Sequence, residues 1–138
     1  MNRSDFHQLA ELRVQEAEVL LTQGFFDGAY YLLGYAVENA FKACIAKQTN
    51  QHDFPPDRKT IEAIYQHDPK KLLKASGLEL EYQKEVLAST AFADNWKIVQ
   101  VWSEKSRYQI GRSAAEINDF YSAVVSKEGV LTWLKKYW

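Results

Sequence analysis

Apolar residues recur at helical spacing along most of the chain, and the longest such run lies between residues 27 and 47. In this segment, DGAYYLLGYAVENAFKACIAK, they follow an i, i+3, i+4, i+7 pattern from Ala29 to Ile45, which places them on one side of an α-helix. Glycine is the only helix breaker in the segment. We therefore predict one long helix from Asp27 to Lys47, with Asp27 as the cap of its first turn.

A neighbouring face of this predicted helix carries an unusual set of side chains: Tyr31, Gly34, Tyr35, Glu38 and Lys42. A helix face that only meets water carries mostly lysine, glutamate and glutamine. We therefore predict that this face contacts something, either another segment of the chain, a second subunit or a ligand.

A shorter amphipathic pattern precedes the long helix and predicts a helix that is capped by Ser4 and ends near Gly24. The connector between the two helices is short, and short connectors join antiparallel neighbours. After the long helix, the stretch from Gln48 to Asp57 is polar and contains Pro55 and Pro56. These prolines predict a loop, because they cannot continue a helix.

Short helices are predicted next, the first from Lys59 to Gln66. Asp68 followed by proline is typical of a helix start, and Gly77 marks the end of that helix. From Glu79 to Val101 the pattern predicts one helix followed by a less regular run, with an irregularity at residues 93–95.

The last long helix is predicted to start at about Ala114. Ser113 and Glu116 match the S-x-x-E capping box, in which two side chains satisfy the backbone of a helix's first turn. Apolar positions continue at helical spacing to Leu134. Gly129 is expected to loosen this helix without ending it, at a cost near 1 kcal/mol relative to alanine.

The patterns together predict an all-α protein, an up-and-down bundle of about five helices. No segment alternates apolar and polar residues in the way of a half-buried strand. The 138 residues suit one domain, residues 1–138. Four tryptophans in the last third of the chain predict that the C-terminal part is firmly packed.

Composition narrows the function classes. Hydrophobic residues make up 46% and charged residues 25%, with a net charge of −1, so the chain is neither disordered in type nor a strongly basic nucleic-acid binder. No stretch is apolar enough for a signal peptide or a membrane span, so we expect a cytoplasmic location and no membrane partner. Cys44 is the single cysteine. Its place on the apolar stripe predicts a core residue rather than a reactive thiol.

A late W-x4-R-Y element, formed by Trp102, Arg107 and Tyr108, precedes the last helix. Together with the segment GFFDGAYYLLGYAVENAFKACIAK, it resembles the HEPN family (higher eukaryotes and prokaryotes nucleotide-binding). The resemblance covers nearly the whole chain. It implies a helical bundle that pairs through a two-fold interface, in a family that includes RNA-cutting toxins, defence nucleases and members that are not nucleases.

The nucleases of this family carry an arginine followed, after four to six residues, by a histidine near the last helix. Here the histidines are His7, His52 and His67, and none follows Arg107 or Arg112. The proton transfers of RNA cleavage usually need an imidazole. We therefore expect no such nuclease activity, and we interpret the three histidines as solvated polar residues.

Glu38 and Lys42 are four residues apart in the favourable order for an ion pair on one helix. We further predict that Arg107 folds back to Glu38 in a bidentate bond that fixes the last connector. Tyr31, Tyr35 and Tyr108 fit either a base-stacking shelf or, as the favoured interpretation, a subunit interface in which Gly34 permits close approach. Trp102 and Lys42 complete this candidate site.

Three functional hypotheses follow. The first is a dimerising interaction or regulatory module, linked to toxin–antitoxin or defence biology, with a homodimer and a nucleotidyltransferase-type protein as expected partners. The second is a metal-independent endoribonuclease that uses Arg107, Tyr108 and Glu38. The third is a nucleotide-binding regulator with its ligand between Tyr31, Tyr35 and Arg107. The sequence predicts no cofactor and no metal site, and it supports RNA or nucleotide as a ligand only through the family resemblance.

Overall fold

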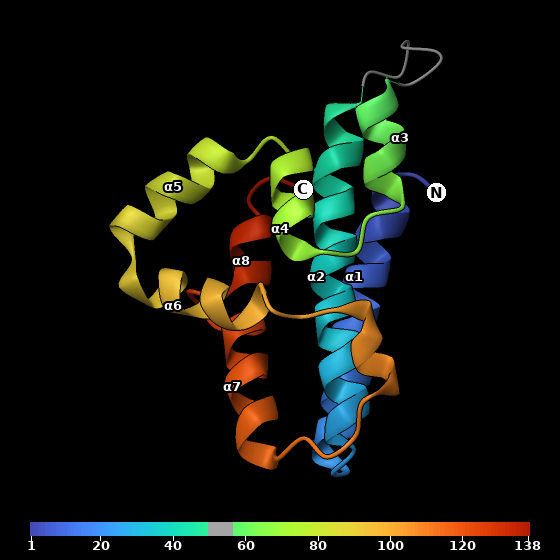
Figure 1. Cartoon of the computed structure of the whole chain (residues 1–138), viewed down its shortest axis with the longest axis vertical. Coiled ribbons are helices and arrows are strands. Elements are labelled where there is room, and N and C mark those ends of the chain that lie inside the picture. The colour runs from blue at the N-terminus through green and yellow to red at the C-terminus, as the bar shows by residue number, and fades with distance from the viewer. Residues whose placement is uncertain (50–56) are drawn as a thin grey trace.

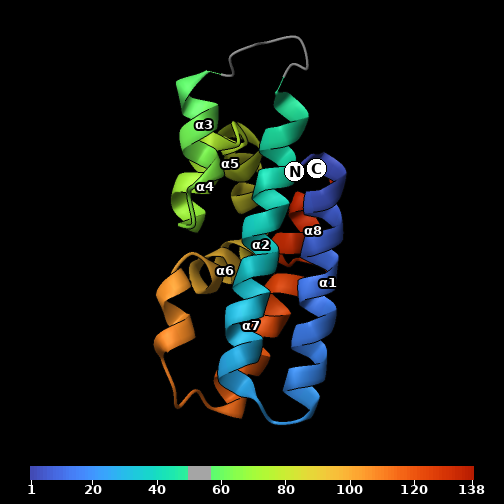
Figure 2. The ribbon, with the colours of Figure 1, turned by 90° about the vertical axis from the view of Figure 1, so that its right-hand side faces the viewer.

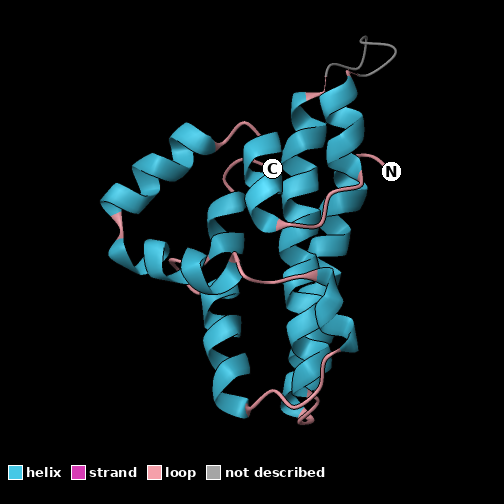
Figure 3. Cartoon of the chain, in the orientation of Figure 1, coloured by secondary structure: helices cyan, strands magenta, loops and turns pink. Residues whose placement is uncertain are grey.

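The computed structural model describes residues 1–49 and 57–138, and every regular element in these residues is a helix (Figure 3). The predicted all-α bundle is therefore confirmed, with more helices than the five expected. His52, Pro55 and Pro56 lie outside the described residues. The elements are α1 (Arg3–Thr22), α2 (Phe26–Gln48), α3 (Arg58–Ile64), α4 (Pro69–Ala75), α5 (Glu79–Ala88), α6 (Thr90–Val99), the 3-10 helix η1 (Glu104–Tyr108), α7 (Ala114–Val125) and α8 (Val130–Leu134).

The first two helices form the antiparallel hairpin that their short connector predicts (Figure 1). Gly24 closes α1 with a φ of 82°, a left-handed conformation that favours glycine. The predicted cap at Ser4 is wrong by two positions. Asn2 caps α1 by accepting from the backbone N–H of Asp5, while the Asp5 carboxylate accepts from the N–H of Asn2. This reciprocal pair satisfies two N–H groups at the helix start.

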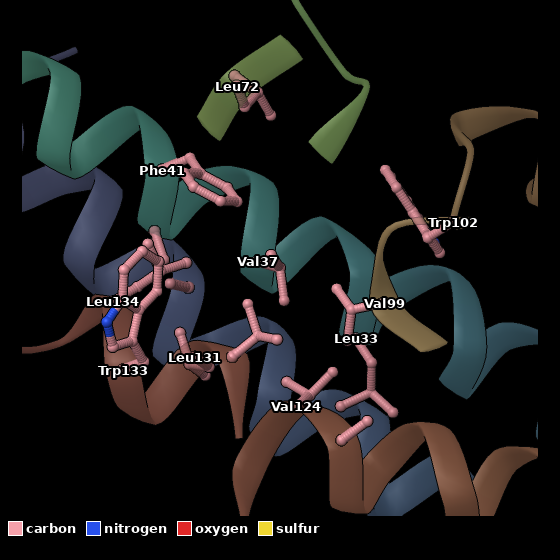
Figure 4. Close-up of a cluster of buried hydrophobic side chains, with 14 of the residues drawn as sticks. Leu33, Val37, Phe41, Leu72, Val99, Trp102, Val124, Leu131, Trp133 and Leu134 are labelled. Atoms are coloured by element: carbon pink, nitrogen blue, oxygen red, sulfur yellow. The ribbon is translucent and has the colours of Figure 1, made fainter. Parts of the chain in front are cut away.

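Helix α2 lies at the centre of the molecule and contributes more buried hydrophobic residues to the core than any other helix among the described residues. Leu33, Val37 and Phe41 are fully buried, and Val37 points from α2 toward α7 (Figure 4), while the Phe41 ring lies edge-on to Trp96 of α6 with the ring centroids 6.2 Å apart. On another side of α2, α4 and η1 pack against it, and Leu72 lies near Phe41 (Figure 4). Thirteen of its residues are buried, so α2 is a core helix almost all round, as a helix must be when neighbours cover several of its faces.

Asp27 does not cap α2, contrary to the sequence prediction. Phe25 takes the cap position without a side-chain hydrogen bond. The Asp27 carboxylate instead accepts from the backbone N–H of Gly111 (3.1 Å) and of Arg112 (2.9 Å), and these hydrogen bonds lower the pKa of Asp27. The Arg112 guanidinium lies 3.4 Å from the ring centroid of Tyr30. The start of α2 thus anchors the connector that leads into α7.

The segment from Glu79 to Val101 is divided at Ser89, whereas the sequence predicted an irregularity at residues 93–95. The Ser89 hydroxyl accepts from the N–H of Phe92 and so caps α6. Asn95 lies within α6, and its side-chain amide donates to the backbone oxygen of Glu128 (3.0 Å). This bond ties α6 to the turn between α7 and α8.

The predicted start of the last helix is confirmed, since Ser113 caps α7 by accepting from the N–H of Glu116 (3.2 Å). The prediction that Gly129 leaves this helix intact is wrong. The Thr132 hydroxyl donates to the carbonyl of Ser126 (2.7 Å), which satisfies backbone at the end of α7. A Cβ on Gly129 would lie 2.5 Å from the carbonyl oxygen of Val124, so only glycine fits this turn.

The two ends of the described chain meet at the same end of the bundle (Figure 2). Arg3 donates to the backbone oxygen of Trp138 (2.5 Å), and the rings of His7 and Trp138 stack at 4.2 Å. Trp133 is buried. The aromatic C-terminal part therefore packs on the bundle, as its tryptophans predict. None of the helices in the described residues has the length and apolar character needed to cross a bilayer.

Cys44 lies in the core, as predicted, with its thiol 3.8 Å from the carbonyl oxygen of Leu134. Burial raises the pKa of this thiol from 9.0 to about 12. At a given pH below 9, this rise lowers the fraction of Cys44 in the thiolate form to roughly a thousandth of that in an ordinary exposed cysteine. The thiolate is the form that reacts with disulfide reagents. We expect native protein to resist labelling by an aromatic disulfide reagent at pH 8, and urea-unfolded protein to label at once. Rapid stoichiometric labelling of the folded protein would contradict this assignment.

Candidate functional site

The indole of Trp102 from the same chain fills the space beside the backbone of Gly34 on α2. A Cβ at Gly34 would lie 2.0 Å from the indole nitrogen of Trp102, and Trp102 is only 2% exposed. The ring of Tyr31 stacks on this indole at 6.2 Å. The close approach that Gly34 was predicted to permit is therefore made within the chain, and this glycine does not provide a contact for a second subunit.

Glu38 lies one turn beyond Gly34, and its side chain is 1% exposed. The Oε1 atom accepts from Lys42 Nζ at 2.7 Å and lies 2.9 Å from Nδ1 of His67. The Oε2 atom is buried and has no protein partner. The predicted pair of Glu38 and Lys42 is thus confirmed, but it is buried rather than a surface ion pair.

His67 lies between α3 and α4 and connects two carboxylates. Its Nδ1 faces Glu38, and its Nε2 lies 3.2 Å from a carboxylate oxygen of Glu104 on η1. The interpretation of His67 as a solvated residue is therefore wrong. Within residues 1–49 and 57–138, no three carboxylate, histidine or cysteine side chains are arranged to hold a metal ion. This includes Glu38, His67 and Glu104.

His7 was also interpreted as solvated, and this too is wrong. It is half-buried against Trp138, and its Nε2 atom is buried without a hydrogen-bond partner. Burial lowers its pKa, and the charges of Arg3 and Lys47 lower it further.

Arg107 does not reach Glu38, so the predicted bidentate bond is wrong. Lys42 and His67 already bind Oε1 of Glu38, and Arg107 is exposed on η1. Its guanidinium lies 4.8 Å from the ring centroid of Tyr108. The neighbouring Tyr108, and to a smaller extent Tyr31, raise the pKa of Arg107. The reason is the geometry of η1, which buries Ser106 against α2 and turns the next residue outward.

The three tyrosines do not form one continuous shelf. The rings of Tyr31 and Tyr35 lie 5.8 Å apart on successive turns of α2. Tyr108 is 76% exposed on η1 and contacts Arg107 rather than the other two. Burial raises the pKa of Tyr35, and the nearby charge of Glu38 adds to this effect.

A groove of about 1310 Å³ lies between the start of α1, the C-terminal half of α2 and α3. Tyr35 borders it, whereas Tyr31 and Arg107 do not. No carboxylate lines this groove among the described residues, and four cationic side chains do. These are Arg3, Arg13, Lys42 and Lys47, and we call the groove that they line the basic groove.

The basic groove also offers neutral polar groups and an apolar wall. Ser4, Asn39 and Thr60 supply side-chain hydroxyl and amide groups, and the apolar lining includes Phe6, Leu9 and Ile64. Two of the cations already have carboxylate partners outside the lining, since Arg13 binds Glu16 at 2.6 Å and Lys42 binds Glu38. Burial lowers the pKa of His7 most, and the charges of Arg3 and Lys47 lower it further against the opposing charge of Glu11, so these two cations of the groove also act on the N-terminal part of α1.

Sequence reasoning missed Arg3, Arg13, Lys47 and Asn39 as site residues. The two arginines lie ten positions apart on α1, and Lys47 lies in the last turn of α2. No local motif connects them, because only the α1–α2 hairpin and the return of α3 bring them to one groove. The one local signal was Lys42, which the sequence placed on the unusual face of α2.

Comparison of the chain with protein-family models, with characterised proteins and with solved structures gave no significant match. The HEPN resemblance therefore remains a hypothesis.

Replacing Gly34 by alanine tests the contact with Trp102. We expect G34A to lower the free energy of unfolding by about 1–3 kcal/mol, the usual effect of overpacking a core. The measurement is urea unfolding followed by circular dichroism. Gly28→Ala is the matched control on the same helix, because its new Cβ would meet only the mobile end of Leu20 at 3.2 Å. Equal stability of G34A and wild type would show that Trp102 does not occupy this position.

Removing one partner of the buried ion pair tests the environment of Glu38. We expect Lys42→Met to lower the free energy of unfolding by about 3 kcal/mol at pH 8, because it removes the ammonium partner of a buried carboxylate and leaves His67 as its remaining partner. Adding Glu38→Gln to this variant recovers most of the loss. Arg107→Ala is the control, and as an exposed residue it is expected to change stability by no more than about 0.5 kcal/mol. A larger loss in R107A than in K42M would restore the Arg107–Glu38 prediction.

Proposed function

We propose that this chain is a HEPN-like helical module that binds a nucleotide with two or more phosphates in the basic groove. The observation that carries this proposal is the lining itself: Arg3, Arg13, Lys42 and Lys47 face one concave space, and no carboxylate lines it among the described residues. Arginine and lysine bind phosphate oxygens through charge-assisted hydrogen bonds. This corresponds to the third hypothesis from the sequence, with the ligand moved from Tyr31 and Arg107 to the neighbouring groove.

The remaining lining suits the other parts of a nucleotide. Binding sites for small molecules combine apolar walls with a few polar groups that fix orientation, and they measure roughly 300–1000 Å³. The basic groove, at about 1310 Å³, has room for such a ligand. Phe6, Leu9 and Ile64 offer an apolar surface for a base, while Asn39 and Thr60 offer hydrogen bonds to a base or a ribose.

A nucleotide fits the charge distribution better than an RNA chain does. RNA binding draws on an extended basic surface that follows the backbone. This protein has a net charge of −1, and its groove-lining cations gather in a single concavity. Cleavage of RNA by Arg107, Tyr108 and Glu38 is not favoured, because Glu38 is buried in contact with Lys42 and His67 while the other two residues are exposed.

The regulatory role and the partners remain predictions from the family resemblance. A homodimer, a nucleotidyltransferase-type partner and a place in toxin–antitoxin biology are compatible with a nucleotide-binding module. The exposed side chains of Tyr108 and Ile110, at 76% and 92%, offer apolar surface outside the basic groove.

Calorimetric titration with adenosine, AMP, ADP and ATP tests the proposal. We expect affinity to rise with the number of phosphates and adenosine to bind weakest, since the cations of the groove supply most of the attraction. A melting-temperature shift at millimolar ATP provides a second readout. Binding of a labelled single-stranded RNA, without binding of ATP, would overturn the proposal in favour of a nucleic-acid module.

Charge-removing variants locate the site. We expect Lys47→Gln to weaken ATP binding by about tenfold, since a hydrogen bond to a charged group contributes about 1.5 kcal/mol or more. Lys136→Gln is the matched control, because Lys136 is exposed, carries the same charge and does not line the basic groove. Equal losses in the two variants would show a non-specific charge effect and no site in the groove.

A further inference from the structure

The Glu38 carboxylate has two possible counter-charges in contact with the same oxygen. Lys42 Nζ lies 2.7 Å and His67 Nδ1 lies 2.9 Å from Oε1 of Glu38. A carboxylate that is 1% exposed needs one compensating positive charge, because an unpaired charge in the interior is strongly destabilising. One cation satisfies this requirement, so Lys42 and a protonated His67 are alternatives.

Lys42 belongs to the basic groove as well as to this buried pair. Its side chain is 11% exposed, and it lines the groove together with Arg3, Arg13 and Lys47. A phosphate group in the groove competes with Glu38 for the Lys42 ammonium. Any displacement of Nζ toward the phosphate leaves Glu38 with less compensation, and His67 is the remaining group that can supply it.

We infer that nucleotide binding in the basic groove is coupled to uptake of a proton by His67, because Lys42 and protonated His67 are alternative counter-charges for Glu38. This inference rests on the proposed function, and it names how the same site is regulated. Its consequence is that affinity for the nucleotide rises as the pH falls through the range in which His67 takes up its proton.

Charged groups face His67 from several elements. Glu38 from α2 and Glu104 from η1 face its two ring nitrogens, and Asp68 follows it in the chain. Lys42 binds the same oxygen of Glu38 that His67 contacts. Nearby, burial raises the pKa of Tyr35; the charges of Glu38 and Glu104 add to this rise, and the charge of Arg13 on α1 opposes it. The side chain of His67 is 36% exposed, so solvent supplies the proton.

A nuclear magnetic resonance titration of the free protein tests the exchange of counter-charges without a ligand. The ring signals of His67 are assigned by comparison with His67→Gln and followed from pH 4.5 to pH 9. We expect His67 in Lys42→Met to take up its proton at a higher pH than in wild type, a gain in proton affinity that follows from the loss of the competing positive charge. The double variant E38Q/K42M loses this gain. An unchanged titration in K42M overturns the inference.

Glu38→Gln provides an independent variant in case K42M does not fold. Loss of the carboxylate removes the group that favours the charged ring, so we expect His67 to take up its proton at a lower pH than in wild type. Unchanged titration in E38Q also overturns the inference. The ring of His7, which contacts Trp138 at the end of the bundle, is the internal control and is expected to titrate alike in all variants.

Calorimetric titration with ATP in buffers of different ionisation enthalpy measures the number of protons that the complex takes up or releases per ATP bound. We expect wild type to take up as much as one proton more per ATP than His67→Gln, because protons exchanged by the ATP phosphates are common to both proteins. Equal proton exchange in the two proteins overturns the inference and leaves the proposed function intact. Absence of binding refutes the proposed function, and in that case the titrations of K42M and E38Q still decide whether Lys42 and His67 exchange roles.

Discussion

The buried carboxylate of Glu38 is the constraint on which the arrangement around α2 depends. A carboxylate transferred from water to a protein interior loses several kcal/mol of solvation, and only well-placed partners offset this. Lys42 comes from the same helix, so it is in place once α2 forms. His67 and Glu104 come from the α3–α4 connection and from η1. Docking of these segments in another register would leave charges unpaired, so Glu38 favours one packing over its alternatives.

The contact between Gly34 and Trp102 acts next to this charge and for a different reason. A glycine in the middle of a long helix lowers helix stability by up to about 1 kcal/mol relative to alanine. Here it allows an indole to lie directly against the helix backbone, at a distance that any side chain would prevent. The same face of α2 thus holds the segment at the start of η1 in two ways: Trp102, just before η1, packs on Gly34, and Glu104 of η1 is linked to Glu38 through His67. This face of α2 resembles a subunit interface in its sequence, but Gly34 and Glu38 make their contacts within the chain.

Local patterns explain what the sequence could predict. The hairpin, the start of α4 at Asp68, the start of α7 at Ser113 and the pair of Glu38 with Lys42 involve residues at most a few positions apart or a connector of a few residues. The failures are of two kinds. Neighbouring residues compete for one role, as Asn2 and Ser4 do at the start of α1. Other roles depend on distant partners, as when Asp27 binds the backbone 84 and 85 residues later.

The contact between His67 and Glu38 shows why the sequence alone did not predict this part of the candidate site. It reaches Glu38 across 29 residues, and no spacing rule connects a loop histidine to a helix carboxylate at that distance. Once the fold joins them, Lys42 is the only side chain among the described residues that both forms an ion pair with Glu38 and lines the basic groove. A ligand shifts an equilibrium only by its difference in affinity for the two states. Here that difference is carried by one ammonium group, so groove and imidazole can be coupled without any movement of the helices.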